Sequence, residues 1–383
     1  MKKVAVVTAT RAEYGILRPL IMKLEAEPEI ELQLLVTGTH LSEKYGNTQN
    51  EIEKDELPIY VKFPILEDGN TAYDVSCTIA NAIREFADYF SHEHPDLLIV
   101  LGDRTEMLGI CCAAMNERIP IAHLHGGELT EGAVDDCVRH ALTKMSYLHF
   151  PASEEYRKRI IQLGENPDRV FNVGALGVEN ILKTSLFSYK EICESVGIPQ
   201  GKKYVVVTFH PVTLEVGSAA GQVESLIKAM CQRDEYFYLI TKANADVGGE
   251  LVNTRFEAYC QSVPNAKLVA SLGMQRYLSA VKYSSFVLGN SSSGIIEAPA
   301  LGVPTVNIGD RQKGRLMADT IIQCGTSTEE IVAAMKMASV IEPCISNLYG
   351  DGNTSEKIIS VIKAFLYDNK INLKKKFYDV EFS

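Results

Sequence analysis

Carboxylates and imidazoles follow two successive apolar runs in the first half of the chain. Asp103 comes one glycine after the run 96–101, and His125 and Glu128 come after the run 119–123. Asp135 stands at the start of a segment with helical period. Because the carboxyl ends of parallel strands meet at one edge of a sheet, we expect these groups to converge. Converging carboxylates and imidazoles perturb one another's pKa and can move protons to and from carbon or oxygen.

The segment around Asp135 also has a purely structural interpretation. Asp135 and Arg139, and likewise Asp136 and His140, stand at i,i+4 spacing on the expected helix. A surface network of ion pairs explains this helix as well as a catalytic role does.

A loop of small polar residues in the second half is suited to phosphate. Gly289-Asn290-Ser291-Ser292-Ser293-Gly294 follows an expected strand and precedes an expected helix, where N–H groups and hydroxyls can cradle a diphosphate. Glu297, one turn later, can reach ribose hydroxyls. An ordinary helix N-cap is the alternative. Neither G-x-G-x-x-G nor G-x-x-x-x-G-K-[ST] is present.

Further polar residues stand at the ends of expected strands. Arg11 follows the first strand, Arg311 begins a basic loop, and His210 ends a strand that Pro211 terminates. The arginines can supply positive charge to an anionic ligand. Each can equally be interpreted as a solvated cation in a surface loop. His40 and Asn244 either contact ligand or only terminate structure.

Composition and charge bound the class of protein. The chain has 383 residues, 46% of them hydrophobic, and a net charge of -11. A prior of about 150 residues per domain predicts two domains, or at most three. The acidic balance disfavours binding to nucleic acid or to an anionic membrane surface.

No apolar run nears the roughly 20 residues of a membrane helix, and no signal peptide precedes the first strand, so we expect a cytoplasmic protein. The nine cysteines, without C-x-x-C, indicate reduced thiols.

Short β-branched runs alternate with helical segments, which predicts an α/β fold of two doubly wound, Rossmann-like halves with parallel sheets. We expect strands at 4–8, 32–37, 96–101, 119–123 and 148–151, and then at 204–209, 236–241, 286–288 and 305–308. Helices are expected at 16–27, 72–90, 135–145, 154–163, 223–231 and 356–367. The predicted domains are 1–170, joined by a returning C-terminal helix in 366–383, and 171–365. A cleft between the halves, at the carboxyl ends of both sheets, is the expected ligand site.

Together these segments resemble the bacterial hydrolysing UDP-N-acetylglucosamine 2-epimerases of sialic-acid biosynthesis, in order and over essentially the whole chain. The matching motifs in the first half are Arg11-Ala12-Glu13-Tyr14-Gly15, Thr37-Gly38-Thr39-His40, Tyr45-Gly46-Asn47-Thr48, Gly102-Asp103-Arg104, His125-Gly126-Gly127-Glu128 and Arg139-His140-Ala141-Leu142-Thr143-Lys144. Those in the second half are His210-Pro211-Val212-Thr213, the small polar loop and Gly309-Asp310-Arg311-Gln312.

The resemblance implies a fold of the glycosyltransferase-B (GT-B) type, a UDP-sugar substrate, no metal or nicotinamide cofactor, and a homodimer or homotetramer. It implies catalytic roles for Asp103 and Asp135 and places His210 near the diphosphate. It also implies nucleotide contacts from Arg11, His40, Asn244, Ser291, Ser292, Glu297 and Arg311. We add Arg104, Ser271, Asn290, Ser293 and Gly294 to the expected binding residues.

The resemblance leaves two points open. Many relatives have a glutamate where this chain has His125, so either His125 or Glu128 can take a third acid/base role. The expected reaction converts UDP-N-acetylglucosamine and water to N-acetylmannosamine and UDP through 2-acetamidoglucal. The same reaction on UDP-2,4-diacetamido-2,4,6-trideoxyglucose is the alternative substrate. A GT-B glycosyltransferase and a nucleotide-sugar sensor are alternatives of another class.

Overall fold

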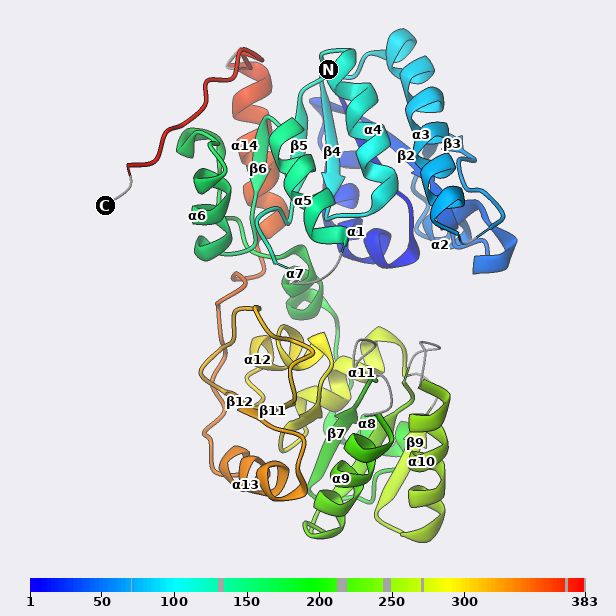
Figure 1. The fold of residues 1–383 in the computed structure, drawn as a ribbon, viewed down its shortest axis with the longest axis vertical. Helices are drawn as coiled ribbons and strands as arrows, with labels where there is room; N and C mark the ends of the chain where they lie inside the picture. The colour runs from blue at the N-terminus through cyan, green and yellow to red at the C-terminus, as the bar shows by residue number, and fades with distance from the viewer. Residues whose placement is uncertain are drawn as a thin grey trace. The chain divides into compact units, whose positions relative to one another are not determined.

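The computed structural model describes residues 1–69, 71–129, 134–211, 219–243, 249–269, 272–368 and 371–381. The chain divides into two units, Met1–Asn180 with Gly350–Ser383, and Ile181–Tyr349. Each unit is built on a six-stranded parallel sheet with helices on both faces (Figure 1). The expectation of two doubly wound α/β halves is confirmed.

The sheet of the first unit has the order β3-β2-β1-β4-β5-β6. Its strands are β1 (Lys2–Thr8), β2 (Ile30–Thr37), β3 (Ile59–Phe63), β4 (Leu97–Leu101), β5 (Ile121–Leu124) and β6 (Leu148–Phe150). The inner strands β1 and β4 are continuous apolar runs because both of their faces are covered by helices.

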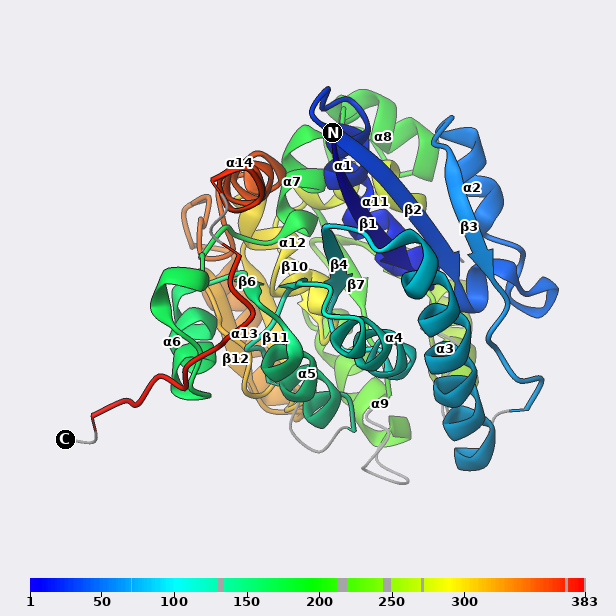
Figure 2. The same cartoon turned by 90° about the horizontal axis from the view of Figure 1, so that it is seen from above.

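Helices cover the two faces of this sheet separately (Figure 2). One face packs on α1 (Arg11–Glu25) and α14 (Thr354–Tyr367). The opposite face packs on α3 (Ala72–Glu93), α4 (Thr105–Asn116) and α5 (Val134–Met145). Alternate residues of β1 enter the two cores: Val4 and Val6 face α1, whereas Ala5 and Val7 face α3. The remaining helices are α2 (Gln49–Lys54), α6 (Glu154–Gln162) and α7 (Leu176–Lys183), with 3-10 turns η1 (Gly38–Leu41), η2 (Glu43–Tyr45) and η3 (Pro167–Arg169).

The sheet of the second unit has the order β12-β11-β10-β7-β8-β9. Its strands are β7 (Tyr204–Thr208), β8 (Phe237–Thr241), β9 (Ala266–Val269), β10 (Val287–Gly289), β11 (Thr305–Ile308) and β12 (Ile321–Cys324). One core lies against α9 (Ala219–Cys231), α10 (Gly249–Ser262) and α13 (Thr328–Ala338). The other lies against α8 (Tyr189–Val196), α11 (Gly273–Lys282) and α12 (Glu297–Ala300), and a 3-10 turn, η4 (Ser292–Gly294), follows β10.

The structure extends and adjusts the sequence-based expectations. Strands β3, β9 and β12 were not expected; each lies at a sheet edge and is only partly buried, so its apolar pattern is weak. The division falls after Asn180 and before Gly350 instead of at 170/171 and 365/366. The cause is packing, because Leu176 of α7 and Ile358 of α14 lie in the first unit's core. None of the described helices is both long and apolar enough to cross a membrane.

Candidate active site and nucleotide-binding loop

The first unit gathers acid and base groups at the carboxyl ends of β4 and β5. Gly102 turns the chain with a φ of 72° after β4, so that Asp103 and Arg104 emerge before α4 begins. After β5, His125 has a φ of 60°. The next turn needs glycine, because Gly127 has a φ of 81° and a Cβ there would lie 2.4 Å from the Tyr156 carbonyl oxygen. These two turns place the predicted groups at one edge of the sheet.

Asp103 is the electrostatic centre of this cluster. The guanidinium of Arg139, on α5, forms an ion pair with its carboxylate. Burial raises the pKa of Asp103, the positive charge of Arg139 opposes that rise, and the negative charges of Asp135 and Glu128 add to it. Asp135 and Glu128 therefore both act on the pKa of Asp103, and perturbed carboxylates of this kind are typical of sites that transfer protons.

Arg139 and two histidines organise the surroundings of Asp103. Arg139 also donates to the Glu128 carbonyl oxygen at 2.9 Å, and its Nη1 lies 3.3 Å from Asp136. His125 Nδ1 lies 3.4 Å from Glu128 Oε1, and His140 Nε2 lies 3.4 Å from Asp136 Oδ2, the latter as the i,i+4 spacing predicts. Of the two predicted i,i+4 pairs, Asp136–His140 is found, whereas Arg139 pairs with Asp103 and Asp136.

His123, which the sequence analysis did not single out, fixes the turn before Asp103. Burial lowers the pKa of His123 to about 3, so its ring is neutral at pH 7. Its Nε2 donates to the Gly102 carbonyl oxygen at 2.7 Å, and Nδ1 lies 3.2 Å from the Thr143 hydroxyl. A histidine inside a strand carries no sequence signal that distinguishes this positioning role from that of a core residue.

The other predicted residues of the first unit have protein partners. Arg104 donates to Glu106 at 2.6 Å, and the exposed Arg11 pairs with Glu51 at 2.9 Å. His40 is buried, with its ring nitrogens 3.0 Å from the Thr8 hydroxyl and 2.8 Å from the Thr48 hydroxyl. A ligand contact by His40 stays a prediction, and it must compete with these two threonines.

In the second unit, Asn290 joins the ends of three neighbouring strands, β7, β10 and β11. Its Oδ1 accepts from the His210 N–H at 2.7 Å, and its Nδ2 donates to the His210 carbonyl oxygen at 2.8 Å. Arg311 and Gln312 donate to its carbonyl oxygen at 3.1 and 2.9 Å. The predicted His210 therefore contacts the side-chain amide of the buried Asn290, and the predicted Arg311 contacts the main-chain carbonyl of the same residue.

The loop after Asn290 presents groups with unused hydrogen-bonding capacity. Ser291 accepts from the Ser293 N–H at 3.3 Å, and Ser292, Ser293 and Gly294 form η4. Among the described residues, the Ser293 hydroxyl, Glu297 Oε2 and the Tyr277 hydroxyl are buried without a hydrogen-bond partner. Burial raises the pKa of Glu297. Tyr277, on α11, was not predicted and has no motif around it that could have indicated it.

Two predicted residues, Asn244 and Ser271, lie outside the described residues. Within the described part of the chain, no group of three or more His, Cys, Asp or Glu side chains is arranged to hold a metal ion.

Comparison with known proteins decides the family. The family model described as UDP-N-acetylglucosamine 2-epimerase matches residues 22–363. The chain belongs to this UDP-N-acetylglucosamine 2-epimerase family.

Its similarity to individual relatives extends over most of the chain. The polysialic acid biosynthesis protein P7 of Escherichia coli is 38% identical over 99% of this chain and 98% of its own length. The GDP/UDP-N,N'-diacetylbacillosamine 2-epimerase (hydrolyzing) of Campylobacter jejuni is 41% identical over 84% of each chain.

A solved epimerase of this family has the same fold. The UDP-GlcNAc 2-epimerase of Neisseria meningitidis, solved bound to UDP-GlcNAc, superposes with a TM-score of 0.79 at 19% identity, over 94% of this chain and 99% of its own. The two units are therefore Rossmann-like domains of the GT-B type, as the resemblance implied.

Proposed function

We propose that the chain is a hydrolysing UDP-N-acetylglucosamine 2-epimerase, which releases UDP and N-acetylmannosamine for sialic-acid biosynthesis. Family membership supports the 2-epimerase class. The name of the 38% identical relative, polysialic acid biosynthesis protein P7, supports the pathway because the similarity covers both chains nearly completely. The observation that carries the chemistry is the cluster in which Arg139, Glu128 and Asp135 act on the pKa of Asp103.

The proposed reaction begins with elimination of UDP across C1 and C2 of the sugar. The C1–O bond breaks, its electron pair leaves with the diphosphate, and a base removes the C2 proton to give 2-acetamidoglucal. The C2 proton is only weakly acidic, so departure of UDP runs ahead of its removal and builds positive charge at C1. Carboxylates held in place before the reaction stabilise that charge without reorganising.

Asp103 is better suited than Asp135 to act as the base that removes the C2 proton. Burial raises the pKa of Asp103, and a base whose pKa lies closer to the working pH accepts a proton more readily. Asp135 is exposed at the start of α5. We assign Asp135 to charge stabilisation and leave return of a proton to C2, from the opposite face, to either His125 or Glu128, which lie 3.4 Å apart.

The leaving diphosphate is assigned to the second unit. His210 and Arg311, which meet at Asn290, supply donors and positive charge, and the Ser291, Ser292 and Ser293 loop supplies hydroxyls and N–H groups. Glu297, whose Oε2 is without a partner among the described residues, is assigned to the ribose hydroxyls. Water then adds to C1 of the glycal, which completes the hydrolysis.

A second candidate substrate is UDP-N,N'-diacetylbacillosamine, a UDP-2,4-diacetamido-2,4,6-trideoxy sugar. The observation that favours it is the 41% identity to the Campylobacter jejuni enzyme named for this substrate. The chemistry at C1 and C2 is unchanged, so the two candidates differ only in what the protein contacts at C4 and C6. The ratio of kcat/KM for the two UDP-sugars decides between them.

Proton NMR of the protein with each UDP-sugar in deuterated buffer tests the proposal. We expect free UDP and N-acetylmannosamine with deuterium at C2, because the proton returned to C2 comes from solvent. An equilibrium with UDP-N-acetylmannosamine would indicate the non-hydrolysing reaction instead. A product that keeps its original C2 hydrogen contradicts elimination, and turnover that requires an acceptor sugar indicates a glycosyltransferase.

A further inference from the structure

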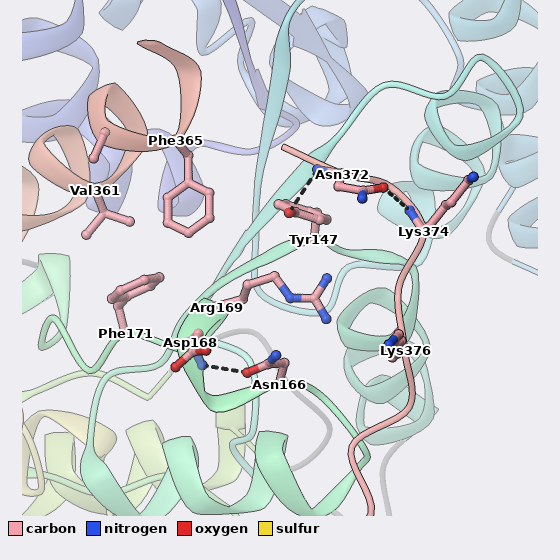
Figure 3. A pocket seen from close by; sticks show the side chains of 11 residues that line it. Tyr147, Asn166, Asp168, Arg169, Phe171, Val361, Phe365, Asn372, Lys374 and Lys376 are labelled. Atoms are coloured by element: carbon pink, nitrogen blue, oxygen red, sulfur yellow. Dashed lines mark hydrogen bonds between the residues drawn. The ribbon is translucent and has the colours of Figure 1, made fainter. Parts of the chain in front are cut away.

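The first unit contains a cavity that none of the predicted site residues lines. Its volume is about 650 Å³, within the roughly 300–1,000 Å³ typical of small-molecule pockets. It lies beside β6, η3, α14 and the C-terminal segment 371–381 (Figure 3). The residues that line it are Tyr147, Asn166, Asp168, Arg169, Phe171, Val361, Ala364, Phe365, Asn372, Lys374 and Lys376.

Arg169 is a largely buried residue whose side chain lines this cavity. It is only 8% exposed, and no described residue forms a hydrogen bond or an ion pair with its guanidinium. The guanidinium stacks on the ring of Tyr147, with its Cζ 4.8 Å from the ring centroid. The guanidinium has five N–H donors. A guanidinium that faces a cavity with donors free of protein acceptors is suited to binding an anion.

The mouth of the cavity adds positive charge. Lys374 and Lys376 are exposed on the C-terminal segment, and Asp168 is the one acidic residue among the described lining residues. Burial lowers the pKa of the neighbouring Lys375, its ion pair with Glu165 at 2.8 Å opposes this change, and the charge of Arg169 adds to it. This concentration of cations stands out in a chain whose net charge is -11.

The walls of the cavity are aromatic. The ring of Phe365 on α14 is edge-on to Phe171, at 5.9 Å between centroids, and to Tyr147, at 6.3 Å. In Figure 3 Phe365 and Phe171 lie to the left of Tyr147, and Arg169 lies below Tyr147. Aromatic rings arranged edge-on bind other planar rings favourably, whereas a bare inorganic anion would leave this apolar surface unused.

The cavity lies at the opposite end of the sheet from Asp103. Tyr147 directly precedes β6, and Val170 forms a parallel bridge with His149 in the middle of that strand, so Arg169, one residue earlier, lies toward the strand's amino end. Asp103 and His125 follow the carboxyl ends of β4 and β5. A ligand in the cavity would therefore not occupy the acid/base cluster.

We propose that this cavity is a second binding site, which takes a small organic anion with a carboxylate or phosphate on the Arg169 guanidinium and a planar ring against Tyr147, Phe171 and Phe365. Lys374 and Lys376 attract the anion to the mouth.

Isothermal titration calorimetry on the full chain tests this site, with phenyl phosphate and phenylacetate as probes. Benzyl alcohol supplies the ring without the charge, and inorganic phosphate supplies the charge without the ring. We expect at least one ring-bearing anion to bind about tenfold or more tightly than both half-ligands. Absence of saturable binding for both probes at millimolar concentration, or equal binding of phosphate alone, overturns the proposal.

Substitutions locate the binding. Arg169→Gln should weaken it about tenfold or more, while the matched Arg84→Gln on exposed α3 leaves it unchanged. Equal affinity in Arg169→Gln overturns the assignment. If that variant does not fold, the exposed pair Lys374→Gln and Lys376→Gln replaces it. The double variant should weaken binding severalfold and reduce its dependence on salt, and unchanged affinity overturns the proposal.

Discussion

Arg139 forms an ion pair with Asp103 from a side chain that is only 5% exposed, whereas the Asp103 side chain remains 29% exposed. The guanidinium is thus fixed in the protein interior, and the carboxylate it holds faces outward. An ion pair of this kind both orients a carboxylate and lowers its pKa. The two functions can be separated by mutation.

Replacing Asp103 by asparagine should abolish turnover and leave UDP binding nearly intact. The amide has the same size but cannot accept the C2 proton, so only acid/base function is lost. Turnover of UDP-N-acetylglucosamine and calorimetric titration with UDP measure the two effects. Loss of UDP affinity as large as the loss of turnover would contradict the proposed role.

Replacing Arg139 by glutamine should raise the pKa of Asp103 further, because the positive charge that opposes its rise is removed. A base must be deprotonated to act, so the acidic limb of the kcat/KM profile should move to higher pH. We expect kcat to fall roughly 10- to 100-fold because the carboxylate is no longer oriented. Arg139→Lys keeps the charge and should keep the limb near its original pH. A purely structural Arg139 would change stability without moving the limb.

The strand Val287–Gly289 should tolerate no side chain at its last residue. Gly289 has a φ of 142°, and a Cβ there would lie 1.9 Å from the Thr208 carbonyl oxygen on the paired strand. We expect Gly289→Ala to lower the free energy of unfolding by about 2 kcal/mol or more, and to disturb the Asn290 junction beside it. Gly221→Ala, in the same unit on α9 with open space around it, should be neutral or stabilising by up to about 1 kcal/mol. Chemical denaturation of both variants checks this contrast.

Glu165 should account for part of the loss of folding stability at low pH. Burial alone would raise the pKa of Glu165, but hydrogen bonds from His149, Lys144 and Lys375 outweigh it and hold the pKa at about 2. The ordinary pKa of a glutamate is 4.5, so the contribution of Glu165 is complete above pH 4.5 and is lost as pH falls toward 2. Glu165→Gln should therefore lower stability at pH 7 by about 3 kcal/mol and flatten its decline between these pH values.

The matched control for that measurement is Glu342→Gln, which changes an exposed glutamate. It should leave the pH dependence of unfolding as it is in the original chain. An equally steep acid transition in Glu165→Gln and in the control would show that Glu165 makes no such contribution.

The sequence predicts strands best where burial on both faces requires a continuous run of apolar residues. The apolar runs of β1, β4 and β7 are covered on both faces, and the polar residues that follow them had to emerge at one edge of each sheet. That placed Asp103 and His125 in one unit, and His210 and Asn290 in the other. The edge strand β9 carries a weaker pattern because it is only partly buried, so it escaped prediction.

Contacts between residues far apart in the sequence could not be predicted from sequence patterns. Arg139 was expected to pair along its own helix, and nothing in the spacing indicated Asp103 as its partner, 36 residues away. The direction of a side chain is equally hidden: His40 follows β2, as a ligand-contacting residue would, yet its ring turns inward to Thr8 and Thr48. The cavity around Arg169 depends on a C-terminal segment whose sequence has no motif.

The chain returns to its first unit at α14, and this return determines the order in which the two units can fold during translation. Ile358 and Ile362 of α14 complete the core against α1, and Ser355 donates to the buried Glu179 at 2.6 Å. Residues 181–349 leave the ribosome before α14 does, so the second unit can fold while the first still lacks one of its helices. A nascent chain halted before α14 would therefore carry a finished second domain and an exposed apolar groove on the first, which makes the late stage of translation the point of greatest need for a chaperone.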